Sequence, residues 1–451
     1  MRNYFHHPFR VSPSQGGGRE QVNNVDFAIE YDFCKRLNSW FQSKSRYSLG
    51  SNGRIELAMR RRTPKVLIVG TVDVDARIEL MCRLHPAYHA SALGSTEDLG
   101  LKFARAGLPY HVYPMSPYVN PWGDLRSYRE LVRIFRRLRP DIVHTFDTKP
   151  CVWGRLAARA AGVPVIVGTI TGLGTLYVDA DVKTRLVRAI YQPLQRLACH
   201  CSHLTIFYNR EDIAQFTEAG VAPPDRCALV PGSGIHPDQF SRGRVPSDDV
   251  ERVRGDISLR DGEVVVTMIA RLCRSKGVLE FARAADIVRL KLPWVRFVLV
   301  GPWDNRVLDR LSAAEMDRVR QSVTWLGERK DIAAILAVSD ICALPTFYRE
   351  GIPRVLMEAA SMGLPVIATD APGCREVVRN EVNGLLIPLS DAGALASAVE
   401  RLAGDGNLRR VFGAASRELA ITKFDIDIIS SKIAALYGHC LEKTFRGNGN
   451  N

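Results

Sequence analysis

The chain has 451 residues, more than one hydrophobic core usually serves, so two or three domains are expected. Apolar residues make up 46% of it and the mean hydropathy is -0.07, which is typical of a soluble globular protein. Ten scattered cysteines without a C-x-x-C pair indicate reduced cytosolic thiols and exclude a disulfide framework or a zinc site of ordinary spacing.

The net charge of +13 is concentrated in the first half of the chain. Before His236 there are 31 Lys and Arg against 20 Asp and Glu, a net +11, and the remainder has 30 against 28, a net +2. Such asymmetry suits an anionic membrane surface or a phosphate-bearing acceptor. Nucleic acid ranks last among the partners, because no RNA- or DNA-binding motif accompanies the charge.

Residues 1–63 are expected to form an N-terminal extension, partly disordered. It opens with a stretch rich in Gly, Ser and Pro and has no long apolar segment, so secretion is not predicted. One amphipathic helix is predicted there, with Phe33, Leu37 and Trp40 on one face. That face suits either an interfacial anchor or a helix packed on its own domain, and the sequence leaves both open.

From Lys65 onward, apolar segments alternate with amphipathic ones. This βαβα order implies a mostly parallel, doubly wound sheet. The predicted strands are 65–70, 109–115, 141–146 and 164–171, and the predicted helices are 98–107, 125–139 and 152–162. The uncharged stretch 160–178 contains Pro164 and several glycines, which favours a buried strand running into a loop over a transmembrane helix. A basic amphipathic helix over 182–200 follows and is expected to contact an anionic membrane surface.

A second βαβα set begins at 264 and predicts another Rossmann-like sheet. Its predicted strands are 264–272, 295–301, 323–327, 341–346 and 364–369, with a helix over 278–292. Arg271 ends an otherwise apolar strand, and Lys276 stands just before the next helix, with Gly277 helping the intervening loop to turn. A solvated loop lysine is the alternative reading of Lys276.

The segment YREGIPRVLMEAASMG (348–363) places two glutamates eight positions apart. Pro353 is typical of a first helical turn and Gly363 of a helix end, so Glu358 is predicted on a helix and Glu350 in the loop before it. Ligands of such strand–loop–helix units lie at the carboxyl ends of the strands. Two carboxylates there suit hydroxyl donors, so Glu350 is predicted to bind a transferred hexose and Glu358 a ribose. Taken alone, the pair would more simply be two helix-end acids.

This segment resembles the E-x7-E signature of glycosyltransferase family 4, whose members are retaining, nucleotide-sugar-dependent enzymes of the GT-B fold. The text from VTWLGERKDI through SDICALPTFYREGIPRVLMEAASMGLPVIATDAPGCREVV carries the likeness, which runs from about Pro64 to the late 430s. It implies two Rossmann-like domains with a cleft between them. The predicted domains are 64–236, on the acceptor side and completed by a C-terminal helix over 426–443, and 237–425, on the donor side.

The resemblance also implies site residues on the donor side. The spacing from Arg271 to Lys276 matches the family's diphosphate clamp, which would stabilise the charge that grows on the leaving group. With Glu350 and Glu358 it forms a four-point constellation. The other predicted donor-side residues are Gly301, Gly327 and Arg329, in loops expected to carry the nucleotide, and Gly351 and Ile352 beside Glu350.

Two loops of the first half are expected to face the acceptor. They supply His144, Asp147 and Lys149 after one strand and Thr171 and Gly172 after the next. Many family members carry a histidine two or three positions after the one that matches His144, where this chain has Phe146 or Asp147. We take His144 as the catalytic candidate, and the polar role stays open among His144, Asp147 and Lys149.

No metal and no cofactor are predicted. The two Asp-x-Asp patterns, at Asp73 and Asp75 and at Asp425 and Asp427, lie away from the expected donor loops, and a cationic clamp would perform the metal's task.

The resemblance therefore implies a retaining hexosyltransferase. It would use a nucleotide diphosphate sugar, for which uridine diphosphate is the usual base choice, and a lipid-linked or saccharide acceptor of surface polysaccharide synthesis. We expect it at the cytoplasmic face of the membrane, bound peripherally. The alternatives are a sugar-nucleotide 2-epimerase of the same fold and a nucleotide-sugar-binding protein without turnover.

Overall fold

The computed structural model describes residues 62–116, 120–174, 182–303 and 309–447, and from Thr63 onward they belong to one compact unit. The helix predicted around Phe33 and Trp40 lies outside the described residues, as do the side chains of 182–187.

Seven parallel strands form the first sheet, in the order β3-β2-β1-β4-β5-β6-β7. The strands are β1 (Lys65–Val69), β2 (His89–Gly94), β3 (Tyr110–Val112), β4 (Ile142–Thr145), β5 (Val165–Ile170), β6 (Leu204–Phe207) and β7 (Cys227–Leu229). The helices between them are η1 (Val74–Arg77), α3 (Ile78–Leu84), η2 (Glu97–Leu99), α4 (Gly100–Arg105), α5 (Pro121–Leu138), α6 (Pro150–Ala161), α7 (Val182–Cys201), α8 (Arg210–Glu218) and η4 (Pro224–Arg226).

Six parallel strands form the second sheet, in the order β10-β9-β8-β11-β12-β13. The strands are β8 (Val264–Ile269), β9 (Val295–Val300), β10 (Thr324–Trp325), β11 (Ile341–Leu344), β12 (Val366–Thr369) and β13 (Gly384–Ile387). The helices of this half are η5 (Arg242–Arg244), α9 (Ser247–Asp256), η6 (Arg274–Lys276), α10 (Val278–Arg289), α11 (Ala313–Ser322), α12 (Ile332–Val338), α13 (Arg354–Ser361), α14 (Pro372–Arg375), α15 (Ala392–Gly404) and α16 (Gly406–Lys423).

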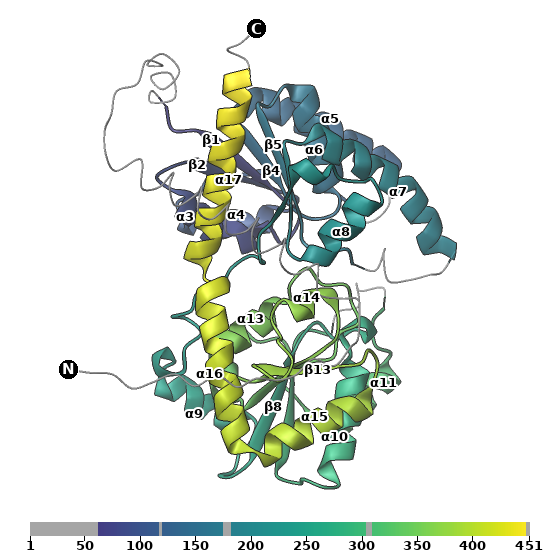
Figure 1. Ribbon diagram of the computed structural model, residues 1–451, viewed down its shortest axis with the longest axis vertical. Coiled ribbons are helices and arrows are strands. Elements are labelled where there is room, and N and C mark those ends of the chain that lie inside the picture. The colour runs from purple at the N-terminus through teal and green to yellow at the C-terminus, as the bar shows by residue number, and fades with distance from the viewer. Residues whose placement is uncertain (1–61, 117–119, 175–181, 304–308, 448–451) are drawn as a thin grey trace, which may run out of the picture. The chain divides into compact units, whose positions relative to one another are not determined.

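The last helix, α17 (Ile426–Gly447), returns to the first sheet (Figure 1). Val66 of β1 belongs to the same core cluster as Ile433 and Tyr437 of α17, whereas the next residue, Leu67, packs with α5 and α6 on the opposite face. Both faces are thus covered, which is why the strands read as continuous apolar runs. Two Rossmann-like parallel-sheet halves are confirmed, and the domain boundaries at 63, 236 and 425 stay predictions.

Two elements differ from their predictions, one because of its helix cap and the other because of its neighbouring strands. The helix predicted to begin at residue 125 begins at Pro121, because the Asn120 side chain accepts a hydrogen bond from Gly123 N at 3.0 Å and Pro121 suits the first turn. No strand was predicted between 70 and 98, yet β2 lies there. Its sequence HASALG is made of small residues with weak strand preference, and the neighbouring strands β1 and β3 impose the conformation.

Candidate active site

The two glutamates of the E-x7-E segment lie in the elements predicted for them. α13 begins after Pro353, and Gly363, with a φ of +78°, follows its end. Glu350 lies in the loop after β11, and Glu358 in the second turn of α13. Both therefore stand at the carboxyl edge of the second sheet.

Lys276 of η6 forms an ion pair with Glu350. The side chains are 14% and 15% exposed, and the Lys276 ammonium also lies 5.0 Å from the centre of the Tyr348 ring. Gly277 permits the approach, because it has a φ of +79° and a Cβ there would lie 2.1 Å from Pro345 O. The predicted clamp lysine and the predicted sugar-binding glutamate are thus brought together by the close packing of two loops.

Arg271, the other predicted clamp residue, lies two residues after the end of β8 and has an exposed side chain. Within the described residues it makes no ion pair. Burial alone would raise the pKa of the nearby Asp309 carboxyl, but hydrogen bonds from Ser275 lower it and the charge of Arg271 adds to the lowering. A solvated arginine beside a lysine that is already paired leaves positive charge available to an anionic ligand.

Glu358 is 9% exposed and accepts a hydrogen bond from Arg354 Nε at 2.7 Å, one helical turn earlier. Burial raises the pKa of the Glu358 carboxyl above its usual value, and the Arg354 ion pair offsets part of that rise. The charge of Glu358 is therefore partly balanced by Arg354, and a neutral hydroxyl that donates a hydrogen bond would stabilise this nearly buried carboxylate further.

Gly301, Gly327 and Ile352, which were predicted to contact the donor, can do so only through their backbone. Gly301 donates its N–H to Gly327 O at 2.8 Å. A Cβ on Gly301 would lie 1.9 Å from Ala270 O, so the loops after β8 and β9 can approach each other only with glycine at this position. Ile352 is 8% exposed and belongs to the core of the second half, which leaves its backbone for any ligand contact.

Arg329 does not fit the donor role predicted for its side chain. Its guanidinium donates to Asp331 at 2.6 and 2.8 Å and to Asp256 at 2.7 Å, and these carboxylates raise its pKa further. The positive charge is already balanced by two acids, so we correct Arg329 to a residue that ties the loop after β10 to α9.

The loop after β11, which carries Glu350, contacts the first half through backbone atoms. Gly174 N donates to Arg349 O at 3.1 Å, and a Cβ on Gly351 would lie 2.0 Å from Thr171 O. Gly172, with a φ of +138°, would carry its Cβ 2.5 Å from Gly351 N. The loop that bears Glu350 is therefore in direct contact with the loop predicted to face the acceptor.

Three polar side chains that the sequence analysis did not single out reinforce this contact. Arg349 donates to Asp212 at 3.2 Å, and Asn209 donates both to Asp212 at 2.9 Å and to Gly351 O at 3.2 Å. Asp212 is 1% exposed, and burial raises its pKa to about 6 although Asn209 and Arg349 oppose the rise. The only sequence signal was the N-x-x-D start of α8, which indicates a helix cap.

His144 is not at the site, and its predicted catalytic role is corrected. It is fully buried in β4, with one ring nitrogen 2.6 Å from the Tyr437 hydroxyl and the other 2.6 Å from Thr169 Oγ1. Burial lowers its pKa well below the usual value, so the ring stays neutral. His144 fastens α17 to the first sheet.

Asp147, another of the residues predicted on the acceptor side, lies just after β4. It has a φ of +66°, which is strained for a residue other than glycine, and its Oδ2 accepts from Thr71 N and Thr71 Oγ1, each at 3.2 Å. Burial and the neighbouring Asp73 raise its pKa to about 6, against the opposing effects of Arg77 and Thr71. Lys149, the other candidate, forms an ion pair with Asp124 at 2.6 Å.

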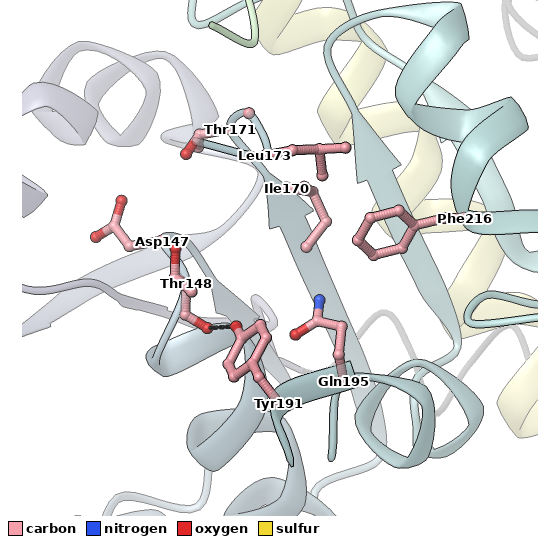
Figure 2. Close-up of a pocket in the computed structure, with 9 residues that line it drawn as sticks. Asp147, Thr148, Ile170, Thr171, Leu173, Tyr191, Gln195 and Phe216 are labelled. Carbon is pink, nitrogen blue, oxygen red and sulfur yellow. Dashed lines mark hydrogen bonds between the residues drawn. The ribbon is translucent and has the colours of Figure 1, made fainter. Parts of the chain in front are cut away.

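A hollow beside Asp147 opens at the carboxyl ends of β4 and β5 (Figure 2). It is lined by Asp147, Thr148, Ile170, Thr171, Gly172, Leu173, Tyr191, Gln195 and Phe216. Thr171 and Gly172, both predicted on the acceptor side, thus share one surface with Asp147.

Comparison with known proteins matches both halves. Residues 66–232 match the family model described as glycosyl transferase 4-like domain, and residues 263–405 match glycosyl transferases group 1. The chain is 30% identical over 351 residues to N,N'-diacetylbacillosaminyl-diphospho-undecaprenol alpha-1,3-N-acetylgalactosaminyltransferase of Campylobacter jejuni, covering 76% of this chain and 88% of that one. The chain is a member of glycosyltransferase family 4.

A second relative and a solved structure support the same family and fold. UDP-Gal:alpha-D-GlcNAc-diphosphoundecaprenol alpha-1,3-galactosyltransferase of Escherichia coli is 31% identical over 319 residues, 70% of this chain and 79% of that one. The solved structure of Anabaena HepE in complex with UDP-glucose has the same fold, with a TM-score of 0.69 at 20% identity over 83% of this chain and 99% of that one. These relatives favour neither an epimerase nor a protein without turnover.

The two Asp-x-Asp pairs of the glycosyltransferase are engaged in other contacts. Asp75 pairs with Lys102 at 2.6 Å and Asp427 with Arg83 at 2.5 Å. Across the ranges that the structure describes, no group of three His, Cys, Asp or Glu side chains is placed to hold a metal ion. In the same ranges, none of the helices combines the length and apolarity that a membrane crossing requires.

Proposed function

We propose that this glycosyltransferase moves a hexose from a UDP-sugar to a saccharide linked to a polyprenyl diphosphate, with retention at the anomeric carbon and without a metal ion or cofactor. The observation that carries the proposal is the Lys276–Glu350 pair at the carboxyl edge of the second sheet, in a loop that touches the acceptor loop of the first half. A cation for the diphosphate and a carboxylate for the sugar then stand on either side of the bond that breaks. The relatives' diphosphoundecaprenol acceptors and the UDP-glucose held by the structural neighbour support the same substrates.

Each residue of the site has a separate role in the proposed reaction. The incoming diphosphate replaces Glu350 as the partner of Lys276, with Arg271 adding a second positive charge, and Glu350 is released to the hydroxyls of the sugar. Glu358 accepts hydrogen bonds from the ribose. The acceptor hydroxyl approaches from the side of Asp147 and attacks on the face that the diphosphate leaves, and the departing phosphate oxygen takes its proton. The configuration is then retained without a protein nucleophile.

We expect the full chain to release UDP only when donor and acceptor are both present. The experiment supplies a panel of UDP-hexoses with a sugar-diphospho-polyprenol, follows the lipid product by mass spectrometry, and assigns the new linkage by NMR. An epimerase would change the donor with no acceptor present, and a binding protein would release no UDP with any acceptor. Either result, or an inverted linkage, would contradict the proposal.

A second expectation concerns the membrane, which we propose α7 contacts at the cytoplasmic face. The described part of α7 exposes Ile190 at 64% and Leu197 at 53%, and Arg196 is exposed beside them. Leu194, between them in the sequence, is half-buried. Apolar side chains flanked by basic ones bind the interface of anionic bilayers, at about 1 kcal/mol per basic residue near the surface.

We therefore expect co-sedimentation with anionic vesicles that weakens as salt is raised. The double substitution Ile190→Gln and Leu197→Gln should reduce it. Leu290→Gln is the matched control, because Leu290 is 89% exposed but belongs to the second half. Equal binding to neutral and anionic vesicles, or an equal loss in the control, would rule out this surface.

A further inference from the structure

The hollow beside Asp147 has one apolar side and one polar side. Ile170, Leu173 and Phe216 supply the apolar wall, from the end of β5, the loop after it and α8. Gln195 projects from α7, and Figure 2 shows its amide nitrogen on the side of Ile170 and Phe216 and its oxygen on the side of Tyr191. The described lining includes no Lys, Arg or His, so the hollow is not built for a phosphate.

Gln195 is the unusual member of this lining. The residue is 1% exposed, and its Oε1 has no hydrogen-bond partner among the described residues. Tyr191, one turn earlier on α7, directs its hydroxyl to Thr148 O at 2.5 Å and so does not serve the glutamine. A buried amide oxygen left unpaired is costly, and native proteins retain few of them.

The group that completes this arrangement must donate one hydrogen bond and fill apolar space next to it. An acetamido group does both, because its N–H can donate to Gln195 Oε1 and its methyl can lie on the apolar wall. A hydroxyl would satisfy the oxygen but would leave the wall uncovered, and a phosphate would add negative charge beside Asp147.

We propose that this hollow recognises the acetamido group of the acceptor sugar, so that Gln195 selects 2-acetamido sugars over the parent hexoses. The inference rests on the proposed function, because it assigns the hollow to the acceptor of that reaction. Gln195 is a specificity-determining residue here, and the bond-making groups lie elsewhere.

The test compares two acceptors that share one polyprenyl diphosphate and differ only in the sugar, N-acetylglucosamine or glucose. We expect the unaltered enzyme to prefer the acetamido acceptor by roughly ten- to thirtyfold in kcat/KM, from one hydrogen bond and one buried methyl. Gln195→Leu should reduce the preference to about threefold or less while leaving the KM for the donor unchanged. Gln192→Leu is the matched control, because Gln192 lies on the same helix outside the hollow.

The outcomes separate the two proposals. Equal use of both acceptors by the unaltered enzyme would overturn the acetamido site while leaving the proposed function standing, and this comparison needs no folded variant. An unchanged preference in Gln195→Leu would overturn the role of Gln195. Transfer to neither acceptor would count against the proposed function itself.

Discussion

Lys276→Ala should lower the rate of sugar transfer about a hundredfold or more, whereas EDTA should leave the rate of the unaltered enzyme unchanged. Negative charge grows on the diphosphate as the sugar departs, and a fixed cation in a partly buried site stabilises it strongly. Lys276 is 14% exposed and is held against Glu350, so its ammonium is already in place before the donor arrives. Single-turnover transfer, with and without chelator, measures both effects.

Arg274→Ala is the matched control for Lys276→Ala. Arg274 lies in the same short helix η6, but its guanidinium pairs with Glu315 at 2.6 Å. Its loss should change the transfer rate little. Complete loss of activity in EDTA that manganese restores would show that one of the aspartate pairs binds a metal ion and that the cationic clamp is misassigned.

The two glutamates should fail differently. Glu350→Gln should lower kcat roughly ten- to a hundredfold with donor KM nearly unchanged, because the sugar ring gains positive charge only in the transition state and a charged hydrogen bond is worth ~1.5–3 kcal/mol. Glu358→Gln should instead raise the donor KM on the same scale and weaken UDP in parallel, because a ribose does not change during the reaction. Steady-state kinetics and UDP titration by calorimetry separate the two cases.

Glu381→Gln provides the baseline for these two variants, because Glu381 pairs with Arg401 on the surface of the same half. It should alter neither kcat nor KM. A reversed pattern, in which Glu358→Gln lowers kcat with normal UDP binding and Glu350→Gln weakens UDP, would exchange the roles of the two residues.

Local sequence signals were sufficient to predict where the main candidate residues of the second half lie. Pro353 and Gly363 delimit α13, and the strand before it is continuously apolar, so the positions of Glu350 and Glu358 followed from the sequence. The position of Lys276 also followed, because Gly277 and the end of β8 place it at the same edge. The resemblance supplied the residue roles, which the spacing alone did not establish.

Side-chain partners were the part that sequence reasoning missed. His144 and Arg329 had suitable chemistry near strand ends, yet Tyr437 bonds to His144, and Asp256 joins the neighbouring Asp331 in pairing with Arg329. Tyr437 is separated from His144 by 293 positions, and Asp256 from Arg329 by 73. No local pattern reports such a contact, because it depends on how α17 and α9 pack.

By itself the sequence determined the two parallel sheets, their helical crossovers and the glycines at which the chain turns after a strand or a helix. These follow from hydrophobic period and from backbone conformations that few residues adopt. Only the tertiary structure decided that Lys276 pairs with Glu350, that Asn209, Asp212 and Arg349 join the loop after β11 to the first half, and that Gln195 Oε1 is buried without a hydrogen-bond partner. Those outcomes depend on packing between segments distant in the chain, where burial and nearby charge set which polar groups are satisfied and which remain for a ligand.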